Sequence, residues 1–231
     1  DISVQLDANG NATITAADID NGSSDACGIA SRVVDVESFS CSDVDTPVSV
    51  TLTVTDVNGN TDFKTATVIV QDNVDPTVLV KDIIVPLGTD GTASISPADI
   101  DDGSYDNCGI ASRVLDVDSF TCSDVGTPVS VKLTVTDVNG NTDSKTATVT
   151  VQDNVDPNVV VQDITVQLDA NGNASITAAD VDNGSTDACG IASRVLDVDS
   201  FTCSDVGTPV SVKLTVTDVN GNTDSKTATV T

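Results

Sequence analysis

The side chains best suited to chemistry in this chain are carboxylates, which recur in three kinds of acidic loop. The chain has 36 Asp and Glu residues against nine Lys and Arg, and it has no His. Calcium prefers about six to eight oxygen ligands from carboxylates, amides and backbone carbonyls, which loops with alternating Asp and Asn supply. The acidic loops therefore predict calcium sites.

Candidate ligands come from each kind of loop. The first kind has the pattern Asp-x-Asp with a further Asp downstream, and it contributes Asp18, Asp20, Asp25, Asp99, Asp101, Asp106, Asp180, Asp182 and Asp187. The second kind contains Asn-Gly, and it contributes Asp56, Asn58, Asp62, Asp137, Asn139, Asp143, Asp218, Asn220 and Asp224. The third kind is a short linker that ends in Pro, and it contributes Asp72, Asp75, Asp153 and Asp156. Because the linker is too short to be a flexible tether, a cation there is expected to neutralise repulsion and stiffen the joint.

Each loop also has a purely structural interpretation. Asp and Asn side chains cap turns, and Asn-Gly is a common hairpin turn, so a plain turn already explains the second kind of loop. The loop from Asp7 to Asn11 is predicted to be only a turn, since its counterpart from Gly88 to Thr92 lacks most of the ligands. For the other two kinds of loop, the sequence leaves both interpretations open.

Six cysteines indicate disulfides and an extracellular protein. A zinc site would favour Cys-x-x-Cys spacing or His, whereas small secreted domains use paired cysteines as bridges. Closing a loop of about 15 residues stabilises a fold by about 3 kcal/mol. Three phenylalanines, at positions 39, 120 and 201, are expected to pack beside the bridges. The predicted bridges lie within single repeats, and they are Cys27–Cys41, Cys108–Cys122 and Cys189–Cys203.

A repeat of 81 residues must position these side chains. The segment DACGIASRVVDVESFSCSDV around Cys27 returns around Cys108 and Cys189, and residues 108–150 are identical to residues 189–231. The predicted domains are residues 1–74 without a first strand, residues 75–155, and residues 156–231 truncated at the end. The chain has no apolar run long enough to span a membrane and no signal peptide, and we expect it to be an internal part of a longer array.

Each repeat is expected to be an all-β sandwich. Val48–Thr55 alternates apolar and polar residues, and the similar run Thr65–Val70 follows an Asn-Gly turn, which is typical of a hairpin with one buried face. Further short runs are Ile2–Leu6, Ala12–Ala16, Ile29–Val36 and Thr77–Val80. Roughly seven short strands per repeat are typical of an Ig-like sandwich. The predicted fold class is therefore all-β, with tandem Ig-like β-sandwich domains in an elongated array.

Three motifs together resemble the hyalin repeat (HYR), an Ig-like module of extracellular proteins. They are Asp-Pro opening a strand, DxCG with FxCxDVGTPVSV downstream, and TVTDVNGN before a last alternating strand. The chain is also similar to repetitive Bacteroidetes-type cell-surface adhesins of bacteria. The family commonly has one more cysteine pair, but Thr77–Val80 and Thr61–Lys64 contain no cysteine here. We therefore expect another device to fasten the ends of the sandwich.

Charge and composition exclude several functions. A formal net charge of −27 argues against nucleic-acid partners and direct membrane contact. Without His or a catalytic motif, the chain is not expected to be an enzyme. The leading hypothesis is a calcium-stiffened stalk or filament segment of an extracellular, cell-surface adhesin. Its partners would be neighbouring repeats of the same chain or fibre, with a surface ligand bound by domains outside this segment. The alternative is a multivalent binding module, which a binding assay on isolated repeats would distinguish.

Overall fold

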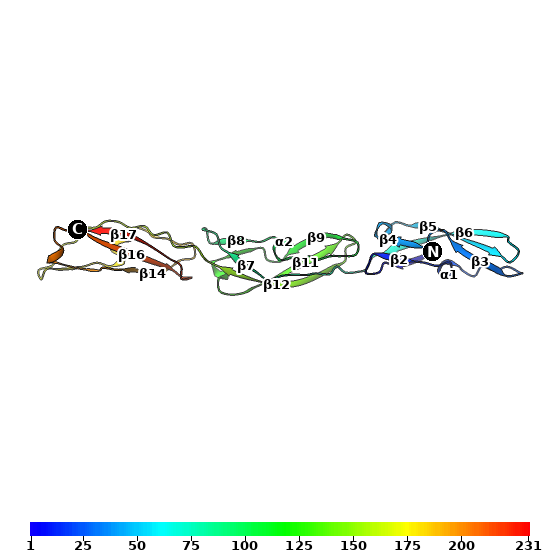
Figure 1. Ribbon diagram of the computed structural model, residues 1–231, viewed down its shortest axis with the longest axis horizontal. Helices are drawn as coiled ribbons and strands as arrows, with labels where there is room; N and C mark the ends of the chain where they lie inside the picture. The colour runs from blue at the N-terminus through cyan, green and yellow to red at the C-terminus, as the bar shows by residue number, and fades with distance from the viewer. The chain divides into compact units, whose positions relative to one another are not determined.

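The structure is a computed structural model that describes residues 1–231, and its many strands confirm the predicted all-β class (Figure 1). No helix has the length and hydropathy needed to cross a membrane. Both compact units of the chain contain parts of the second repeat, so the predicted repeat boundaries after residues 74 and 155 stay a prediction. One unit comprises Asp1–Lys81, Ile100–Asp116 and Lys132–Thr146, and the other Asp82–Asp99, Val117–Val131 and Ala147–Thr231.

The three repeats contain corresponding elements, except that the third has only an isolated bridge between Ile164 and Val230 in place of the first strand. The first repeat has β1 (Ile2–Gln5), β2 (Asn11–Thr13), α1 (Ala16–Ile19), β3 (Ile29–Val34), β4 (Ser38–Ser40), η1 (Cys41–Asp43), β5 (Val48–Asp56) and β6 (Thr61–Gln71). The second has β7 (Ile83–Pro86), β8 (Thr92–Ser94), α2 (Pro97–Ile100), β9 (Ile110–Leu115), β10 (Ser119–Thr121), η2 (Cys122–Asp124), β11 (Val129–Asp137) and β12 (Thr142–Gln152). The third has β13 (Asn173–Ser175), α3 (Ala178–Val181), β14 (Ile191–Leu196), β15 (Ser200–Thr202), η3 (Cys203–Asp205), β16 (Val210–Asp218) and β17 (Thr223–Val230).

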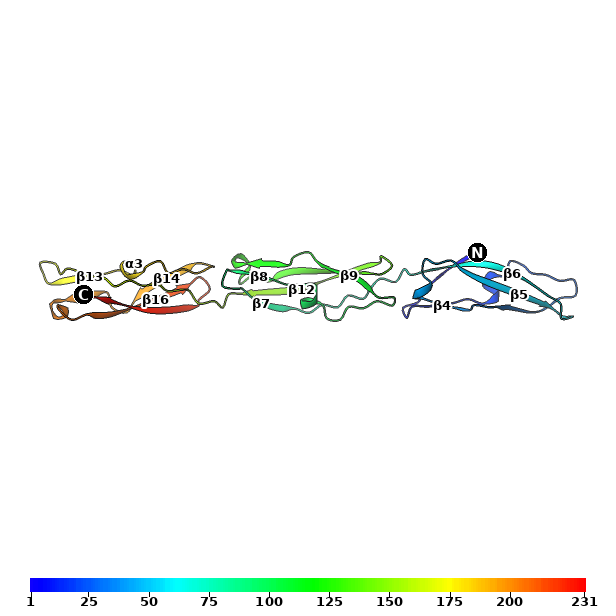
Figure 2. The ribbon, with the colours of Figure 1, turned by 90° about the horizontal axis from the view of Figure 1, so that it is seen from above.

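The first repeat is built on a four-stranded sheet with the order β1-β6-β5-β3. Strands β5 and β6 form the predicted antiparallel hairpin, and the Asp56 N–H donates to the Asn60 carbonyl at 2.9 Å across the Asn-Gly turn (Figure 2). Strand β1 pairs with the end of β6 in parallel. A separate pair, β2 with β4, completes the repeat. The hairpin thus fixes the Asn-Gly loop at one end of the repeat and the linker after β6 at the other.

The core of the first repeat lies between this sheet and the β2–β4 pair. Alternate residues of β5 and β6 point inward, and Val50 and Val68 are both fully buried. Phe39 on β4 is 3% exposed and belongs to the same cluster, against which Cys41 and Cys108 also pack. Each buried Val, Leu or Phe side chain stabilises the fold by about 2 kcal/mol. An aliphatic core with one phenylalanine beside the disulfide agrees with the sequence prediction.

The second unit contains the equivalent pairings of the later repeats. Strands β14, β16 and β17 form a sheet, and β13 pairs with β15. From the second repeat, β7 pairs with β12 in parallel and β8 pairs with β10. The buried residues Val159, Leu214 and Val216 form part of the core of the third repeat.

Two predicted strands differ from the structure. The run Thr77–Val80 makes only isolated bridges, with Thr77 opposite Tyr105 and Val80 opposite Asp101. The run predicted for Ala12–Ala16 ends early, because Thr15 caps the one-turn helix α1. Its N–H and Oγ1 both donate to Asp18 Oδ2, at 2.6 and 2.7 Å. Local capping therefore replaces the last part of that strand.

Candidate metal centre

The disulfides join neighbouring repeats, so the predicted pairing within each repeat is wrong. Cys41 is bonded to Cys108 with 5.3 Å between their Cα atoms, and Cys122 is bonded to Cys189 with 5.2 Å. Each bridge lies within one of the two compact units. The pairs that do not form are Cys27–Cys41, Cys108–Cys122 and Cys189–Cys203, and Cys27 and Cys203 are free.

The strand between the two cysteines of one repeat explains this difference. In the first repeat β3 has six residues and separates Cys27 from Cys41. At about 3.3 Å per residue it covers about 20 Å, whereas a disulfide needs Cα atoms about 4.4–6.8 Å apart. The two cysteines therefore lie at opposite ends of the repeat, and Cys41 instead meets the facing end of the second repeat.

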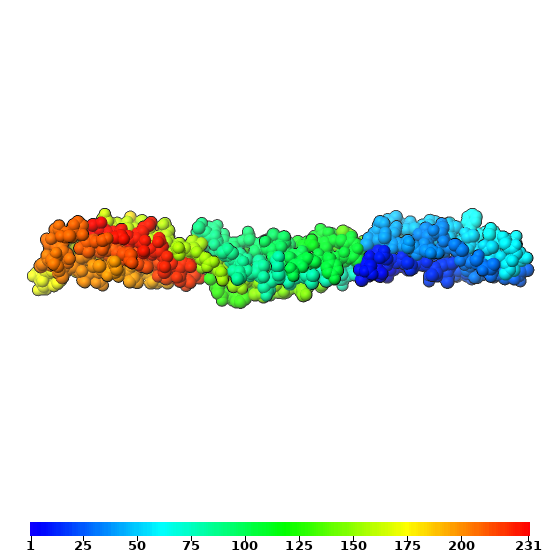
Figure 3. Space-filling model, in the orientation of Figure 1, coloured from blue at the N-terminus to red at the C-terminus, as the bar shows by residue number.

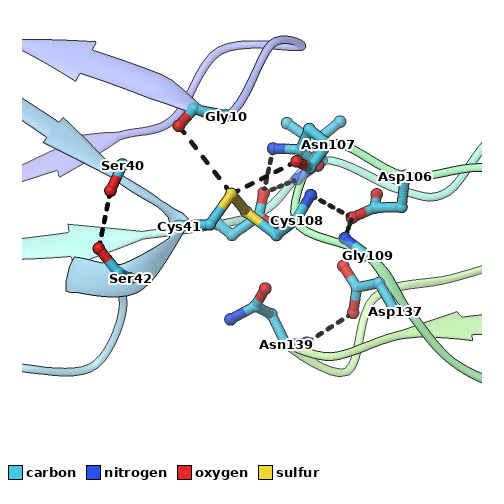
Figure 4. Close-up of a disulfide and its surroundings, with 12 residues drawn as sticks. Gly10, Ser40, Cys41, Ser42, Asp106, Asn107, Cys108, Gly109, Asp137 and Asn139 are labelled. Atoms are coloured by element: carbon cyan, nitrogen blue, oxygen red, sulfur yellow. Dashed lines mark hydrogen bonds between the residues drawn. A yellow bond between two sulfur atoms is a disulfide. The ribbon is translucent and has the colours of Figure 1, made fainter.

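A tight turn of the first repeat lies against this bridge (Figure 4). Gly10 has a φ of 75°, and a Cβ added there would lie 2.8 Å from Cys41 Sγ and 3.1 Å from the Asn107 carbonyl oxygen. Only glycine accommodates both this conformation and this close approach. Asp7 Oδ1 accepts N–H bonds from Asn9 and Asn11, which confirms the turn predicted for this loop. Figure 3 shows the blue N-terminal surface in contact with the green surface of the second repeat.

Three carboxylates meet beside the Cys41–Cys108 bridge, one from each predicted kind of acidic loop. Asp72 lies in the linker, Asp106 lies in the loop before β9, and Asp137 is the last residue of β11. One carboxylate oxygen of each lies within 4.8 Å of the others. Asp72 is 6% exposed and Asp137 is 1% exposed, so the cluster is largely shielded from water.

Two of these carboxylates each keep one buried oxygen without a partner. Asp72 Oδ1 accepts the Val74 N–H at 3.1 Å, while its Oδ2 is buried without a hydrogen bond. Asp106 Oδ1 accepts the N–H groups of Cys108 and Gly109 at 2.8 and 3.0 Å, while its Oδ2 is likewise buried and unpaired. Burying an unpaired carboxylate oxygen is costly, so these atoms are candidate ligands.

Two amide oxygens on the loops that carry Asp106 and Asp137 are also buried. Asn107 Oδ1 and Asn139 Oδ1 are both buried without a hydrogen bond. Asp137 is differently placed, because its Oδ1 accepts the N–H groups of Asn139 and Asn141 at 2.9 and 2.7 Å. Asp137 therefore shapes the Asn-Gly turn and also faces the cluster. Its carboxylate has about four acceptor positions, so both roles are compatible.

The donor set suits calcium better than a softer metal. Two carboxylate and two amide oxygens are buried and unpaired, and calcium takes about six to eight such hard oxygen ligands with water completing the shell. Zinc favours His nitrogen and thiolate sulfur, and the chain has no His. Two carboxylates 4.8 Å apart repel each other by roughly 3.5 kcal/mol at an effective dielectric constant of about 20. A divalent cation bound between the carboxylates attracts both of them and offsets this repulsion.

The junction between the second and third repeats is related but not identical. Asp153 is 8% exposed with its Oδ2 buried and unpaired, and a carboxylate oxygen of Asp187 lies within 4.8 Å of it. Cys189 Sγ lies in the same group, but it is part of a disulfide and is not a thiolate ligand. Asp218 is 1% exposed, and its Oδ1 accepts the N–H groups of three following residues.

Some predicted ligands have structural partners instead. Asp101 is paired with Arg113 at 2.8 Å, and its Oδ1 also accepts the Ser104 N–H at 3.0 Å. Burial acts to raise the pKa of Asp101, but the Ser104 hydrogen bonds and the Arg113 charge together lower it. Asp20 with Arg32 and Asp182 with Arg194 repeat this arrangement. The capping carboxylates Asp18, Asp99 and Asp180 accept bonds from the residue before each short helix.

The remaining predicted ligands lie outside the two clusters. Asp75 and Asp156 are exposed residues of the linkers. Asp62, Asp143 and Asp224 lie near the start of β6, β12 and β17, where Asp62 and Asp143 accept the next N–H group. Asp25, Asp56 and Asn58 correspond to Asp106, Asp137 and Asn139, but they belong to neither cluster, and Asp25 and Asn58 are exposed. Asn220 is exposed, unlike its half-buried counterpart Asn139.

Asn107 and Asn141 are functional candidates that the sequence prediction missed. Asn141 Nδ2 donates to the Asp72 carbonyl at 3.1 Å and to Asp137 Oδ2 at 2.7 Å, which ties the linker to the Asn-Gly turn. Asn222 makes the equivalent bond to the Asp153 carbonyl. The only sequence signal for Asn107 was that the other two repeats have Ala26 and Ala188 at this position.

Comparisons with known proteins give only distant likenesses. No protein-family model matches the chain, and no curated protein matches it. The solved structure of mouse clustered PcdhgC3 EC1-3 is 13% identical over 84% of this chain and 82% of that chain, with a TM-score of 0.32. An I-band fragment from titin is 10% identical over 100% and 95%, with a TM-score of 0.35. Human CDH23 EC21-23 is 14% identical over 79% and 73%, with a TM-score of 0.39.

Proposed function

We propose that this chain is a segment of an extracellular stalk whose successive repeats are joined by a disulfide and a calcium ion. The observation that carries this proposal is the group formed by Asp72, Asp106 and Asp137, whose carboxylate oxygens lie within 4.8 Å of one another at the first junction. Buried, unpaired oxygens of Asp72, Asp106, Asn107 and Asn139 support it. They come from the linker and from two loops of the second repeat. A cation bound by all of them fixes the linker to the repeat that follows it.

Calcium would stiffen the joint through two effects. It removes the repulsion among Asp72, Asp106 and Asp137, whose carboxylate oxygens lie within 4.8 Å of one another. It also restricts the conformations of the linker, because ligands from the linker and from the second repeat bind the same ion. The disulfide alone leaves rotations about its side-chain bonds, whereas a cage of oxygens on separate loops restricts bending in several directions.

The repetitive sequence supports a structural role over ligand recognition. Residues 108–150 and 189–231 are identical, so two repeats carry the same residues over this stretch. Binding hot spots favour Trp, Tyr and Arg, and the chain has no Trp and one Tyr. We therefore assign adhesion to domains outside this segment and assign spacing to these repeats, as in a cell-surface adhesin of the type that the hyalin-like motifs suggest.

Calcium titration of the metal-free chain by isothermal calorimetry tests the proposal directly. We expect saturable binding at the junctions and, in small-angle scattering, a less flexible chain in calcium than in chelator. Magnesium at the same concentration serves as the control, because it prefers about six ligands in a small octahedron and gives up water reluctantly. An absence of heat on calcium addition, together with identical scattering in calcium and chelator, would overturn the proposal.

A further inference from the structure

The Cys41–Cys108 bridge and the carboxylate cluster of the first junction share the loop that runs from Asp106 to Gly109. The N–H groups of Cys108 and Gly109 donate to Asp106 Oδ1 at 2.8 and 3.0 Å. The other oxygen of this carboxylate, Oδ2, is buried without a partner. The position of this candidate ligand therefore depends on where the bridge holds the backbone of Cys108.

The same loop packs on the first repeat around the bridge (Figure 4). The Asn107 carbonyl oxygen lies 3.4 Å from Cys41 Sγ, and a Cβ added to Gly10 would lie 3.1 Å from that oxygen. The Asn107 side chain donates from Nδ2 to the Asp7 carbonyl at 3.2 Å and to Asp72 Oδ1 at 3.3 Å. Asn107 thus connects the bridged cysteines to the linker carboxylate.

The bridge and a bound cation restrain the same part of the chain. The bridge joins Cys41 of the first repeat to Cys108 of the second. The candidate site brings Asp72 of the linker together with Asp106 of that same second-repeat loop, and their carboxylate oxygens lie within 4.8 Å. Opening the bridge gives the loop more conformations, which cation binding then has to order against their entropy. The bridged chain therefore holds these ligands in place before the cation binds.

We propose that the Cys41–Cys108 disulfide regulates calcium binding at the first junction, so that the bridge strengthens the site and calcium in turn protects the bridge from reduction. This inference rests on the proposed function, because it concerns the regulation of the same calcium site. The coupling is reciprocal: the factor by which the bridge raises the affinity for calcium equals the factor by which calcium favours the bridge. The joint is therefore firmest in surroundings that are both oxidising and rich in calcium, as outside a cell.

A tenfold effect is expected in both directions. Coupling between two sites typically changes an affinity by about 5- to 150-fold. The lower part of this range applies here, because Asp137 Oδ1 is held by the N–H groups of its own turn whether or not the bridge is formed. For a two-electron couple, a tenfold change corresponds to a reduction potential about 30 mV lower in saturating calcium than in chelator.

The test uses the double variant Cys27→Ser, Cys203→Ser, which removes the two free thiols and keeps both bridges. The folded chain is equilibrated in a series of glutathione redox buffers, in saturating calcium or in chelator. Two glutathione thiols reduce the bridge to two protein thiols and are themselves oxidised to one glutathione disulfide. Alkylation and peptide mass spectrometry give the reduced fraction, since the sequences around Cys41 and Cys108 each occur once in the chain.

Calorimetry supplies the reciprocal measurement. Calcium is titrated into the oxidised chain and into the same background with Cys41→Ser and Cys108→Ser, while circular dichroism shows whether the strands persist. We expect a roughly tenfold higher Kd at the first junction without the bridge, equal to the factor from the redox titration. If the variant loses its strands, the redox titration decides, because it starts from the folded, bridged chain.

Two variants separate the site from a general effect of cations. Asp106→Asn removes the charge from the shared loop, so the bridge should lose most of its protection by calcium. Asp25→Asn changes the exposed carboxylate at the same position of the first repeat and should keep the protection. Magnesium should protect the bridge much less than calcium does. Equal protection by both ions would assign the effect to screening of the net charge of −27 and reject the inference.

The outcomes distinguish this inference from the proposed function. Normal calcium binding to the oxidised chain, with the same bridge equilibrium in calcium and in chelator, rejects the regulation and leaves the calcium joint intact. An unchanged Kd in a folded chain without the bridge has the same meaning. If the oxidised chain binds no calcium, the proposed function fails and this inference fails with it.

Discussion

Asn107 of the second repeat donates a hydrogen bond from its Nδ2 to Oδ1 of Asp72 in the linker, at 3.3 Å. The same amide donates to the Asp7 carbonyl at 3.2 Å, and its Oδ1 is buried without a partner. One side chain thus connects the linker, a turn of the first repeat and the candidate cation cage. The corresponding residue of the third repeat, Ala188, offers none of these groups, so the two junctions differ chemically.

Replacing Asn107 with Ala should weaken calcium binding at the first junction. The variant loses one oxygen ligand and the amide that holds Asp72 in place. Losing a hydrogen bond to a charged group costs about 1.5 kcal/mol, which corresponds to roughly a tenfold higher Kd. Isothermal calorimetry should show the tighter of two binding steps move toward the weaker one.

The reciprocal change, Ala188→Asn, is the matched test at the second junction. It supplies the missing amide beside Asp153, so we expect the weaker binding step to tighten. If both variants bind calcium with the affinities of the parent chain, Asn107 is not a ligand. If Ala188→Asn tightens the second step while Asn107→Ala leaves the first step unchanged, an amide at this position can bind calcium, but Asn107 does not contribute at the first junction.

Removing the charge of Asp106 should remove most calcium binding at the first junction, because Asp106 Oδ2 is one of the four buried, unpaired oxygens. The change Asp106→Asn keeps the size of the side chain and an acceptor for the N–H groups of Cys108 and Gly109. The matched control is Asp25→Asn, which alters the same position of the first repeat, where the carboxylate is exposed and outside both clusters. Calorimetry should show one site fewer for the first variant and an unchanged stoichiometry for the control.

Much of the fold could be predicted, because alternating residues and Asn-Gly turns act locally. The hairpin of β5 and β6 follows from Val48–Thr55 and the turn after it, and its buried face matches the predicted alternation. The parallel pairing of β1 with β6 could not be predicted, since it joins segments 66 residues apart without a local signal. Short helices at Ala16–Ile19 and its counterparts depend on single capping carboxylates rather than on a periodic pattern.

The candidate site could be predicted only in part. Each acidic loop was identified, but which carboxylate of each loop meets the others depends on the direction of the strands between them. Strand β3 carries the chain away from Cys27, so Cys41 and Asp72 come together at the far end of the first repeat. The length of the expected strand Ile29–Val36 already argues against a bridge between Cys27 and Cys41, because an extended segment of that length holds its two ends too far apart for a disulfide.

Breaking the first bridge should destabilise the chain more than removing a free thiol. The Cys41–Cys108 disulfide spans 67 positions of sequence, which in the chain-entropy model corresponds to about 4 kcal/mol. We expect the double variant Cys41→Ser, Cys108→Ser to unfold at lower urea concentration in chelator. Circular dichroism measures the transition, with Cys27→Ser as the control. Equal midpoints for the two variants would show that the bridge contributes no stability.

Acid should remove the contribution of the Asp101–Arg113 pair. Although burial opposes it, the hydrogen bonds from Ser104 and the charge of Arg113 lower the pKa of Asp101 below its usual value of 3.8. The folded state therefore favours the ionised carboxylate. Its stabilising effect is complete above pH 3.8 and is lost as the pH falls through the lowered pKa.

The change Asp101→Asn should accordingly destabilise the chain at pH 7, by about 1 to 2 kcal/mol, and have little effect at about pH 2. Urea unfolding at the two pH values, in chelator, measures both differences. Asp102→Asn is the matched control, because it removes an adjacent exposed carboxylate outside the Arg113 pair, and it should leave the pH dependence unchanged. A constant difference between Asp101→Asn and the parent chain at both pH values would mean that lost packing, rather than the ionised pair, accounts for the effect.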